Sequence, residues 1–259
     1  MKVCDIDRNQ MYGVLRHVFN ALQVRPRVME LGVCKGDNAQ QLLQRLEPAP
    51  LVLVDSWSAA SNRAYSPFDS LPPWIDPPET YDFYFGGPTR EQATWDRLYE
   101  GCRQRFADRT DVHIVRAFTN EAGPAIRSHA GDVPFDLVYV DASHQYEYVL
   151  RDLMLFQDLV GPNGCFMLND CCHSEAGLRQ NLGVLEAVGN FLKRSDFTPV
   201  AITNTDWSDV VLTRRGSLLE NALHWSLVNS DVAFVDVPPQ LLPAARLIRG
   251  DQRAHLSFT

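Results

Sequence analysis

The sequence lacks an apolar run that approaches the ~20 residues needed to cross a bilayer. It also lacks the apolar core of a secretory signal, because Met1 to Asn20 mixes Asp5, Asp7, Arg8 and Arg16 among its other residues. These two absences exclude a membrane-spanning chain and favour a cytoplasmic protein with no membrane partner.

Cysteine is sparse: the 259 residues include 6, and none forms a C-x-x-C pair. Thiols so few and so scattered do not build a disulfide scaffold. The spacing that tetrahedral zinc ligation favours is also missing. We therefore expect reduced and mostly buried thiols.

A basic excess is missing as well. The chain has 24 Lys and Arg against 32 Asp and Glu, a formal net charge of -8. Nucleic-acid backbones and anionic membranes both require a basic face, so neither is expected as the main partner. No internal repeat occurs, which excludes solenoids and propellers.

The composition is typical of a folded protein, because 45% of the residues are hydrophobic and 22% are charged. Short runs rich in Val, Ile and Leu predict strands at Arg27–Glu30, Leu51–Asp55, Val112–Val115, Phe135–Asp141, Cys165–Asp170, Pro199–Asn204 and Val210–Arg214. Helical patterns occur at Met11–Leu22, Asn38–Leu46, Glu91–Phe106, Glu121–Ser128, Tyr146–Leu159, Leu178–Lys193 and Leu218–Leu227. Apolar strands separated by helices predict a mostly parallel sheet covered on both faces.

The last two strands are separated only by Thr205–Asp209, which is too short for a crossover helix. We therefore expect an α/β, Rossmann-like fold with a mostly parallel seven-stranded sheet and an antiparallel C-terminal hairpin at one edge. One domain should cover residues 1–216, followed by a C-terminal extension over 217–259. An insertion at 56–90, rich in proline and aromatic residues, could be a lid, a contact between copies of the chain, or a structural flap.

A glycine turn follows the first of the apolar runs. Glu30 ends that strand, Gly32 and Gly36 come two and six positions later, and a helix follows. Glycines there let a ligand approach the backbone, and the helix start offers free N–H groups. The pattern lacks the middle glycine of G-x-G-x-x-G, which disfavours a dinucleotide.

The E-x-G-x-x-x-G pattern resembles motif I of class I S-adenosyl-L-methionine (SAM) dependent methyltransferases, whose sheets also combine five parallel strands with a hairpin. The resemblance implies that the acid and the turn hold the methionine part of SAM. Asp55 ends the next strand about 20 residues on, where doubly wound folds place a ribose ligand; a turn-capping aspartate is the alternative. Phe118 and Thr119 follow the third expected strand, and their position alone assigns them to the adenine of SAM. The expected cofactor residues are Glu30, Leu31, Gly32, Gly36, Asp55, Ser56, Phe118, Thr119 and Asp141.

Two further acids, Asp141 and Asp170, end the fourth and fifth expected strands. Adjacent parallel strands bring such ends within roughly 5 Å, in the crevice where α/β sheets bind ligands. Two like charges so close need a cation or a proton. Their oxygens, with the Asn169 amide, suit Mg²⁺, Mn²⁺ or Ca²⁺.

The D-x-x-H-x-Y…R-D-L run that starts at Asp141, followed by a G-P-x-G turn and a strand ending in Asp, resembles metal-dependent sugar O-methyltransferases of the macrocin and mycinamicin type and their wider family, which includes cephalosporin-hydroxylase-like members. The resemblance implies that Asp141, Asn169 and Asp170 bind Mg²⁺ and that His144 is the general base. At Asn169 this family carries a second acid, so the sequence departs from the pattern there. A backbone-bonded residue at a helix start is the alternative for His144.

Together these motifs predict a SAM-dependent O-methyltransferase, assisted by a divalent metal, that acts on a hydroxyl of a small polyhydroxylated acceptor such as a sugar or natural-product unit. The catalytic residues would be His144 and Asp141. One alternative is a metal-independent or inactive SAM-binding protein that serves as an assembly partner. An NAD-dependent oxidoreductase is disfavoured, because the chain lacks the middle glycine and a Tyr-x-x-x-Lys pair.

Overall fold

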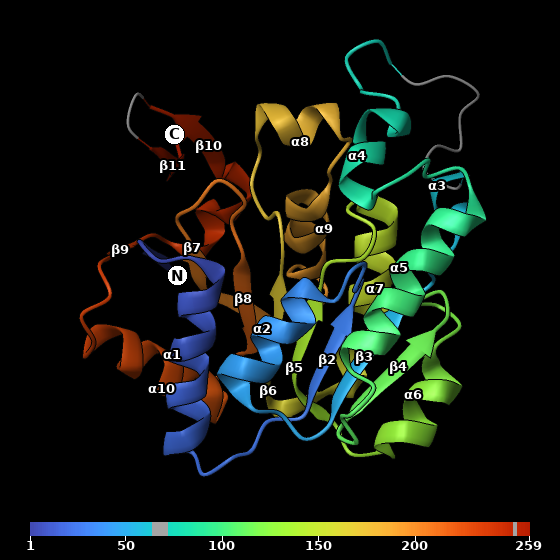
Figure 1. Ribbon diagram of the computed structural model, residues 1–259. Helices are drawn as coiled ribbons and strands as arrows, with labels where there is room; N and C mark the ends of the chain where they lie inside the picture. Colours follow the sequence, from blue (N-terminus) through green and yellow to red (C-terminus); the bar gives the residue numbers. More distant parts are fainter. Residues whose placement is uncertain (64–71, 251–252) are drawn as a thin grey trace.

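The computed structural model describes residues 1–63, 72–250 and 253–259. Within them, nine strands form one sheet in the order β4-β3-β2-β5-β6-β8-β7-β1-β9 (Figure 1). These strands are β1 (Lys2–Cys4), β2 (Val28–Leu31), β3 (Leu51–Asp55), β4 (Val112–Arg116), β5 (Phe135–Val140), β6 (Val160–Leu168), β7 (Phe197–Thr203), β8 (Val210–Arg214) and β9 (Phe234–Asp236). The strands β10 (Arg246–Arg249) and β11 (Ala254–Ser257) pair separately.

The expected sheet is confirmed over its central part. Strands β4, β3, β2, β5 and β6 pair in parallel, and β8 runs antiparallel to both β6 and β7. The antiparallel hairpin of β7 and β8 is confirmed. It does not lie at the edge, however, and the sheet has more than the seven expected strands, because β1 pairs with β7 and β9 pairs with β1. Both extra strands have only three residues, too few for a hydrophobic pattern to indicate them.

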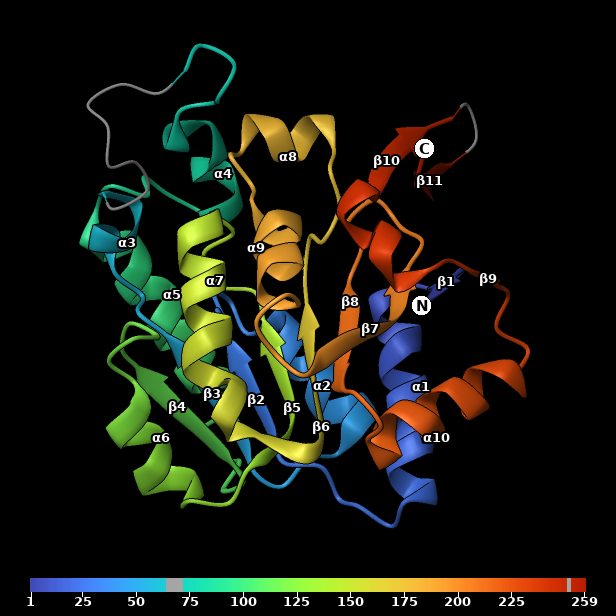
Figure 2. The ribbon, with the colours of Figure 1, turned by 180° about the vertical axis from the view of Figure 1, so that it is seen from behind.

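Helices cover both faces of the sheet (Figures 1 and 2). One apolar cluster joins the sheet to α1 (Arg8–Ala21), α2 (Asp37–Leu46), α5 (Gln92–Arg105) and α10 (Leu218–Val228). The other joins it to α6 (Gly123–Ala130), α7 (Tyr146–Phe156) and α9 (Val184–Phe191). The C-terminal extension thus adds α10 and β9 to the same layers as the rest of the chain.

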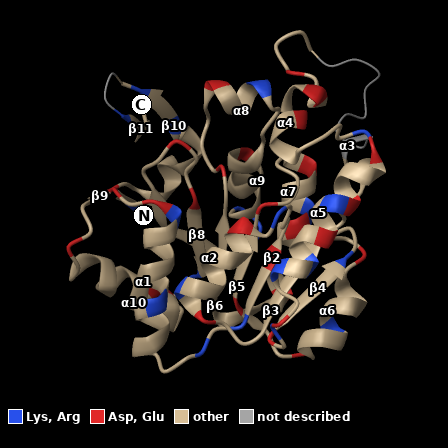
Figure 3. Cartoon of the chain, viewed as in Figure 1, with Lys and Arg blue, Asp and Glu red and all other residues tan. Residues whose placement is uncertain are grey.

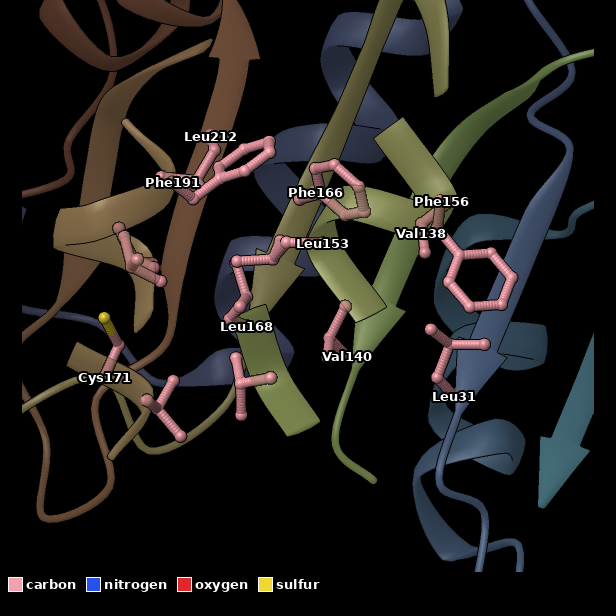
Figure 4. Close-up of a cluster of buried hydrophobic side chains, with 14 of the residues drawn as sticks. Leu31, Val138, Val140, Leu153, Phe156, Phe166, Leu168, Cys171, Phe191 and Leu212 are labelled. Atoms are coloured by element: carbon pink, nitrogen blue, oxygen red, sulfur yellow. The ribbon is translucent and has the colours of Figure 1, made fainter. Parts of the chain in front are cut away.

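The second cluster is built from large side chains on neighbouring elements (Figure 4). The rings of Phe166, Phe191 and Phe197 lie with centroids 5.3 to 6.0 Å apart, and all three side chains are fully buried. Burial of one such side chain contributes roughly 1.5–3 kcal/mol. This packing holds β6, and with it the segment directly after β6 that carries Asp170, in a fixed position.

Helix α1 begins earlier than the apolar pattern predicts. Asp7 accepts a hydrogen bond from the Gln10 backbone at 2.7 Å, and the Gln10 side chain accepts one from the Asp7 backbone at 2.9 Å. This capping box satisfies free N–H groups at the helix start. As a result Arg8 is the first helical residue. The start of α1 points toward the end of the molecule where α8 lies (Figure 1).

The helix expected at Leu178–Lys193 is interrupted, which corrects that prediction. The structure has α8 (Glu175–Arg179) and α9, separated by a turn in which Asn181 has a φ of 55°. Gly183 lies against the chain at Tyr146, where an added Cβ would come within 2.7 Å of the backbone nitrogen. Its own N–H donates to the His144 carbonyl at 2.7 Å, so the break supports the loop that carries His144.

The described part of the 56–90 insertion projects from the same edge of the sheet as α8 (Figure 1). It contains α3 (Ala59–Arg63), a 3₁₀ turn at Pro78–Tyr81 and α4 (Asp82–Phe85). The Asp76 N–H donates to the Arg179 carbonyl at 2.8 Å, which ties the insertion to α8. Residues 64–71, with Tyr65 and Phe68, lie outside the described residues, and the role of a lid or a contact between copies stays a prediction.

Acidic and basic positions are interspersed over the face drawn in Figure 3. Among the helices of the described residues, none is both long enough and apolar enough to cross a membrane. All six cysteines are free, and five of them are buried, as expected from the sequence.

Candidate functional site

The site lies where the direction of the sheet order changes. Strand β2 pairs with β3 on one side and with β5 on the other, and β6 follows β5. In open α/β sheets this switch point forms a crevice at the carboxyl ends of the strands. The residues predicted from the sequence lie in the last positions of β2 and β3 or soon after β2, β3, β4, β5 and β6.

The turn after β2 requires glycine. Gly32 has a φ of 85°, and an added Cβ would lie 2.0 Å from the carbonyl oxygen of Asp141, well inside a van der Waals contact. Gly36 has a φ of 79°, and its Cβ would lie 3.0 Å from Phe106. The backbone of the turn therefore lies directly against the chain that carries Asp141.

Asp55 fixes the shape of this turn. Its Oδ2 accepts hydrogen bonds from the backbone nitrogens of Val33 and Cys34, both at 2.9 Å, and its Oδ1 accepts one from Trp57 at 2.8 Å. Cys34 and Trp57 have positive φ values of 49° and 40°, strained for such residues. Asp55 thus caps the turn, as the alternative reading of this residue expected, and its Oδ1 keeps one lone pair for a ribose hydroxyl.

Glu30 is a buried acid with an unused oxygen. Its Oε1 accepts from Asn38 Nδ2 at 2.9 Å, whereas its Oε2 has no hydrogen-bond partner among the described residues. Burial raises the pKa of Glu30 well above its ordinary value. A buried carboxylate oxygen without a partner suits the ammonium group of an amino acid, so this residue fits the methionine part of SAM.

The remaining expected cofactor residues make contacts mainly with other parts of the protein. Ser56 Oγ lies 2.7 Å from Ser61 Oγ. Leu31 is fully buried in the core, although its carbonyl accepts from the Asp141 nitrogen at 2.7 Å. The Thr119 hydroxyl donates to Asp152 and accepts from Arg151, both at 2.7 Å, and Phe118 is half-buried. No contact of the described structure tests their role at SAM.

Two expected acids meet at one histidine. His144 Nε2 lies 3.0 Å from Asp141 Oδ1 and 3.8 Å from Asp170 Oδ2. Burial alone would lower the pKa of His144, but the hydrogen bond to Asp141 and the charge of Asp170 outweigh it and raise the pKa to about 9. The sequence-based expectation that the ends of the fourth and fifth predicted strands converge therefore agrees with the structure.

Two residues of this cluster were missed by the sequence analysis. Arg8 lies in the cluster with its Nε 3.0 Å from Asp209 Oδ1, and Asp209 also accepts from the Tyr139 hydroxyl at 2.8 Å. Asp209 is 1% exposed, and burial raises its pKa to about 7 against the opposing charge of Arg8. The capping box before Arg8 and the acid at the end of the hairpin loop were the available signals.

The cluster does not fit the expected Mg²⁺ in this arrangement. The Asn169 Oδ1 atom already accepts a hydrogen bond from Arg8 Nη2, and the His144 ring lies between the two carboxylates. Asp170 Oδ1 is buried without a hydrogen-bond partner, but one free oxygen is not a coordination sphere. Over the described ranges, no group of three or more His, Cys, Asp or Glu side chains is arranged to hold a metal ion. The expected Mg²⁺ site at Asp141, Asn169 and Asp170 is therefore not confirmed.

Comparison with known protein families identifies the family of this chain. A family model described as a methyltransferase domain matches residues 29–171. None of the curated proteins compared with the chain matches it.

Solved structures show the fold. A Staphylococcus aureus protein assigned as a caffeoyl-CoA O-methyltransferase has a TM-score of 0.50 at 12% identity, over 80% of this chain and 84% of that one. An O-methyltransferase family protein from Burkholderia thailandensis has 0.46 at 13%, over 79% and 55%. Aeropyrum pernix fibrillarin, in complex with natively bound SAM, has 0.45 at 11%, over 73% and 66%. The first of these confirms the Rossmann-like α/β fold.

Proposed function

The chain belongs to the family of methyltransferase domains, and from this premise we propose that it transfers a methyl group from SAM to a hydroxyl of a small polyhydroxylated acceptor. The finer part of the proposal, a sugar or natural-product unit as acceptor, rests on the resemblance of the Asp141 to Asp170 segment to macrocin-type enzymes.

One observation supports the proposal: the glycine turn after β2 and the proposed general base His144 both lie next to Asp141. A Cβ at Gly32 would lie 2.0 Å from the Asp141 carbonyl, and the side chain of the same Asp141 lies 3.0 Å from His144. The turn and the histidine cluster are therefore neighbours through Asp141, so a ligand held by the turn would lie beside the cluster. Nearness of this kind supplies much of the acceleration of a transfer between two bound groups.

SAM, when bound, supplies an activated methyl group on a sulfonium. Glu30 and the turn at Gly32 and Gly36 would hold its amino-acid part, and Asp55 would face its ribose. His144 would take the proton of the acceptor hydroxyl at Nδ1, the ring nitrogen that does not face Asp141, as the oxygen–methyl bond forms, the methyl–sulfur bond breaks and the electron pair of that bond stays on sulfur. Asp141 positions the imidazole through its hydrogen bond and balances the charge that the ring acquires.

The proposal contains no divalent metal, because Arg8 and His144 take the positions that the ion would need. In this respect the contacts favour the metal-independent alternative. The other alternative, a catalytically inactive SAM-binding protein, has no specific contact in its favour, since the cluster keeps both a base and its orienting carboxylate.

The test is transfer of labelled methyl from SAM to a panel of monosaccharides and glycosylated natural products, in the presence of a chelator. We expect label on one or more hydroxyl acceptors. The His144→Ala variant should lose about 10²–10⁴-fold in kcat and keep its SAM affinity within about twofold, because a general base acts in the transition state.

His17→Ala is the matched control, because His17 is an exposed residue of α1 away from the cluster. SAM binding without label on any hydroxyl of the panel would contradict the assignment and support the inactive alternative. A His144→Ala variant with unchanged kcat would contradict the role of His144.

A further inference from the structure

The histidine cluster contains a cation in the place where the sequence pattern predicts a metal ion. The Arg8 guanidinium contacts residues from three separate parts of the sheet edge. Its Nε lies 3.0 Å from Asp209 Oδ1, its Nη2 donates to Asn169 Oδ1, and its Nη1 lies 3.9 Å from Asp141 Oδ2. Two of these three, Asp141 and Asn169, are members of the expected metal set.

We propose that Arg8 is the built-in cation of this site, which replaces the divalent ion and binds an oxygen of the acceptor. The part of the proposal that concerns the acceptor rests on the proposed methyl transfer, whereas the replacement of the metal does not. A guanidinium stays charged at every physiological pH and neutralises carboxylates without a coordination sphere.

Arg8 is held in place by more than its ion pair. The capping box of Asp7 and Gln10 fixes the backbone of the helix start, and the guanidinium lies 5.4 Å from the ring centroid of Tyr139. Tyr139 in turn donates to Asp209 at 2.8 Å. These contacts give the cation a defined position, as metal ligands would for an ion.

The guanidinium also keeps donors for a ligand. Of its five N–H groups, those of Nη1 have no acceptor within hydrogen-bond distance among the described contacts, since the Nη1 to Asp141 distance is 3.9 Å. The Arg8 side chain is 27% exposed, so these donors can be reached. The two N–H groups of Nη1 point apart, so each can donate to a different oxygen of the acceptor. The acceptor should therefore carry a second oxygen, a hydroxyl or a carboxylate, beside the hydroxyl that is methylated.

The test is Mn²⁺ binding to the whole protein. Binding is measured by electron paramagnetic resonance in the absence of SAM and acceptor. We expect weak or absent binding to the unmodified protein. Arg8→Ala removes the positive charge that neutralises Asp141, Asp170 and Asp209. This variant should therefore bind Mn²⁺ at least about tenfold more tightly than the unmodified protein. Arg8→Lys keeps a positive charge and should resemble the unmodified protein.

Arg16→Ala is the matched control, because Arg16 lies on the same helix and pairs with the exposed Glu47. Circular dichroism establishes that each variant folds, and Arg8→Gln, which keeps more of the side-chain length, is measured in parallel.

Two results would overturn the proposal. One is stoichiometric Mn²⁺ binding to the unmodified protein that Asp141→Asn abolishes. The other is Mn²⁺ affinity in both Arg8→Ala and Arg8→Gln that is no higher than in the unmodified protein. Because this measurement needs neither SAM nor acceptor, failure of the proposed methyl transfer would leave its outcome unchanged.

Discussion

The Nε atom of Arg8 lies 3.0 Å from Oδ1 of Asp209, so the first helix and the loop of the C-terminal hairpin meet in one cluster at the carboxyl edge of the sheet. Asp209 is 1% exposed there, and the cluster also holds Asp141, His144 and Asp170. The charged state of this edge thus depends on contacts between distant parts of the chain.

The first prediction concerns stability and pH at Asp209. Burial raises its pKa in the folded protein to about 7, from 3.8 in the unfolded chain. Between these values the folded state binds more protons, so Asp209 lowers the free energy of unfolding as pH rises from about 4 to 7. Asp209→Asn removes that titration. Relative to the unmodified protein, the variant should gain on the order of 2–4 kcal/mol between pH 4 and pH 8.

Urea unfolding at the two pH values measures this difference, with the exposed Asp158→Asn as control. A constant difference between Asp209→Asn and the unmodified protein would show that Asp209 does not titrate as a buried acid.

The second prediction concerns the pH dependence of catalysis. The hydrogen bond to Asp141 and the charge of Asp170 raise the pKa of His144 to about 9 against the effect of burial, so the unprotonated base is scarce at neutral pH. We expect kcat/KM to rise about tenfold per pH unit up to about pH 9 and then to level off. Asp141→Asn weakens the cause of the shift, so its profile should level off at lower pH. A flat profile from pH 7 to 10 would argue against His144 as the base.

The third prediction compares two glycines. Gly32→Ala places a methyl group against the Asp141 carbonyl at a φ of 85°, so we expect a loss of at least about 2 kcal/mol of stability and a weakening of SAM binding of more than about tenfold. Gly13→Ala, in the middle of α1 with nothing within 4 Å of the added Cβ, should instead stabilise the protein by about 0.5–1 kcal/mol. Thermal unfolding and calorimetry measure both effects, and equal behaviour of the two variants would disprove the close approach at Gly32.

The fourth prediction concerns Glu30. Glu30→Gln keeps the contact with Asn38 and removes the carboxylate charge, so SAM should bind about 10–100-fold more weakly. The unliganded variant should be at least as stable as the unmodified protein, because a buried ionisable group has been replaced by a neutral one. The exposed Glu121→Gln is the control. Unchanged SAM affinity in Glu30→Gln would mean that the cofactor's ammonium group lies elsewhere.

Sequence predicted the central sheet because each of its strands is long and apolar enough to show a pattern, as in Leu51–Asp55. It also predicted that Asp141 and Asp170 converge, because the ends of parallel neighbouring strands lie at one edge. It missed β1 and β9, whose three residues each carry no periodicity.

Arg8 was missed for a different reason. Its place in the cluster depends on β1 pairing with β7, which brings the start of α1 to the hairpin loop. No local pattern encodes that contact. The interruption between α8 and α9 was missed because the apolar spacing continues through Leu182 and Val184, while the backbone turns at Asn181 to fit Gly183 against Tyr146.

The proposed methyl transfer requires that the glycine turn after β2 binds SAM beside the histidine cluster. Isothermal titration calorimetry of the unmodified protein with SAM, with its demethylated product and with NAD tests this most directly. We expect SAM and its product each to bind with one site per chain and NAD not to bind. Measurable binding of NAD without any binding of SAM would contradict it.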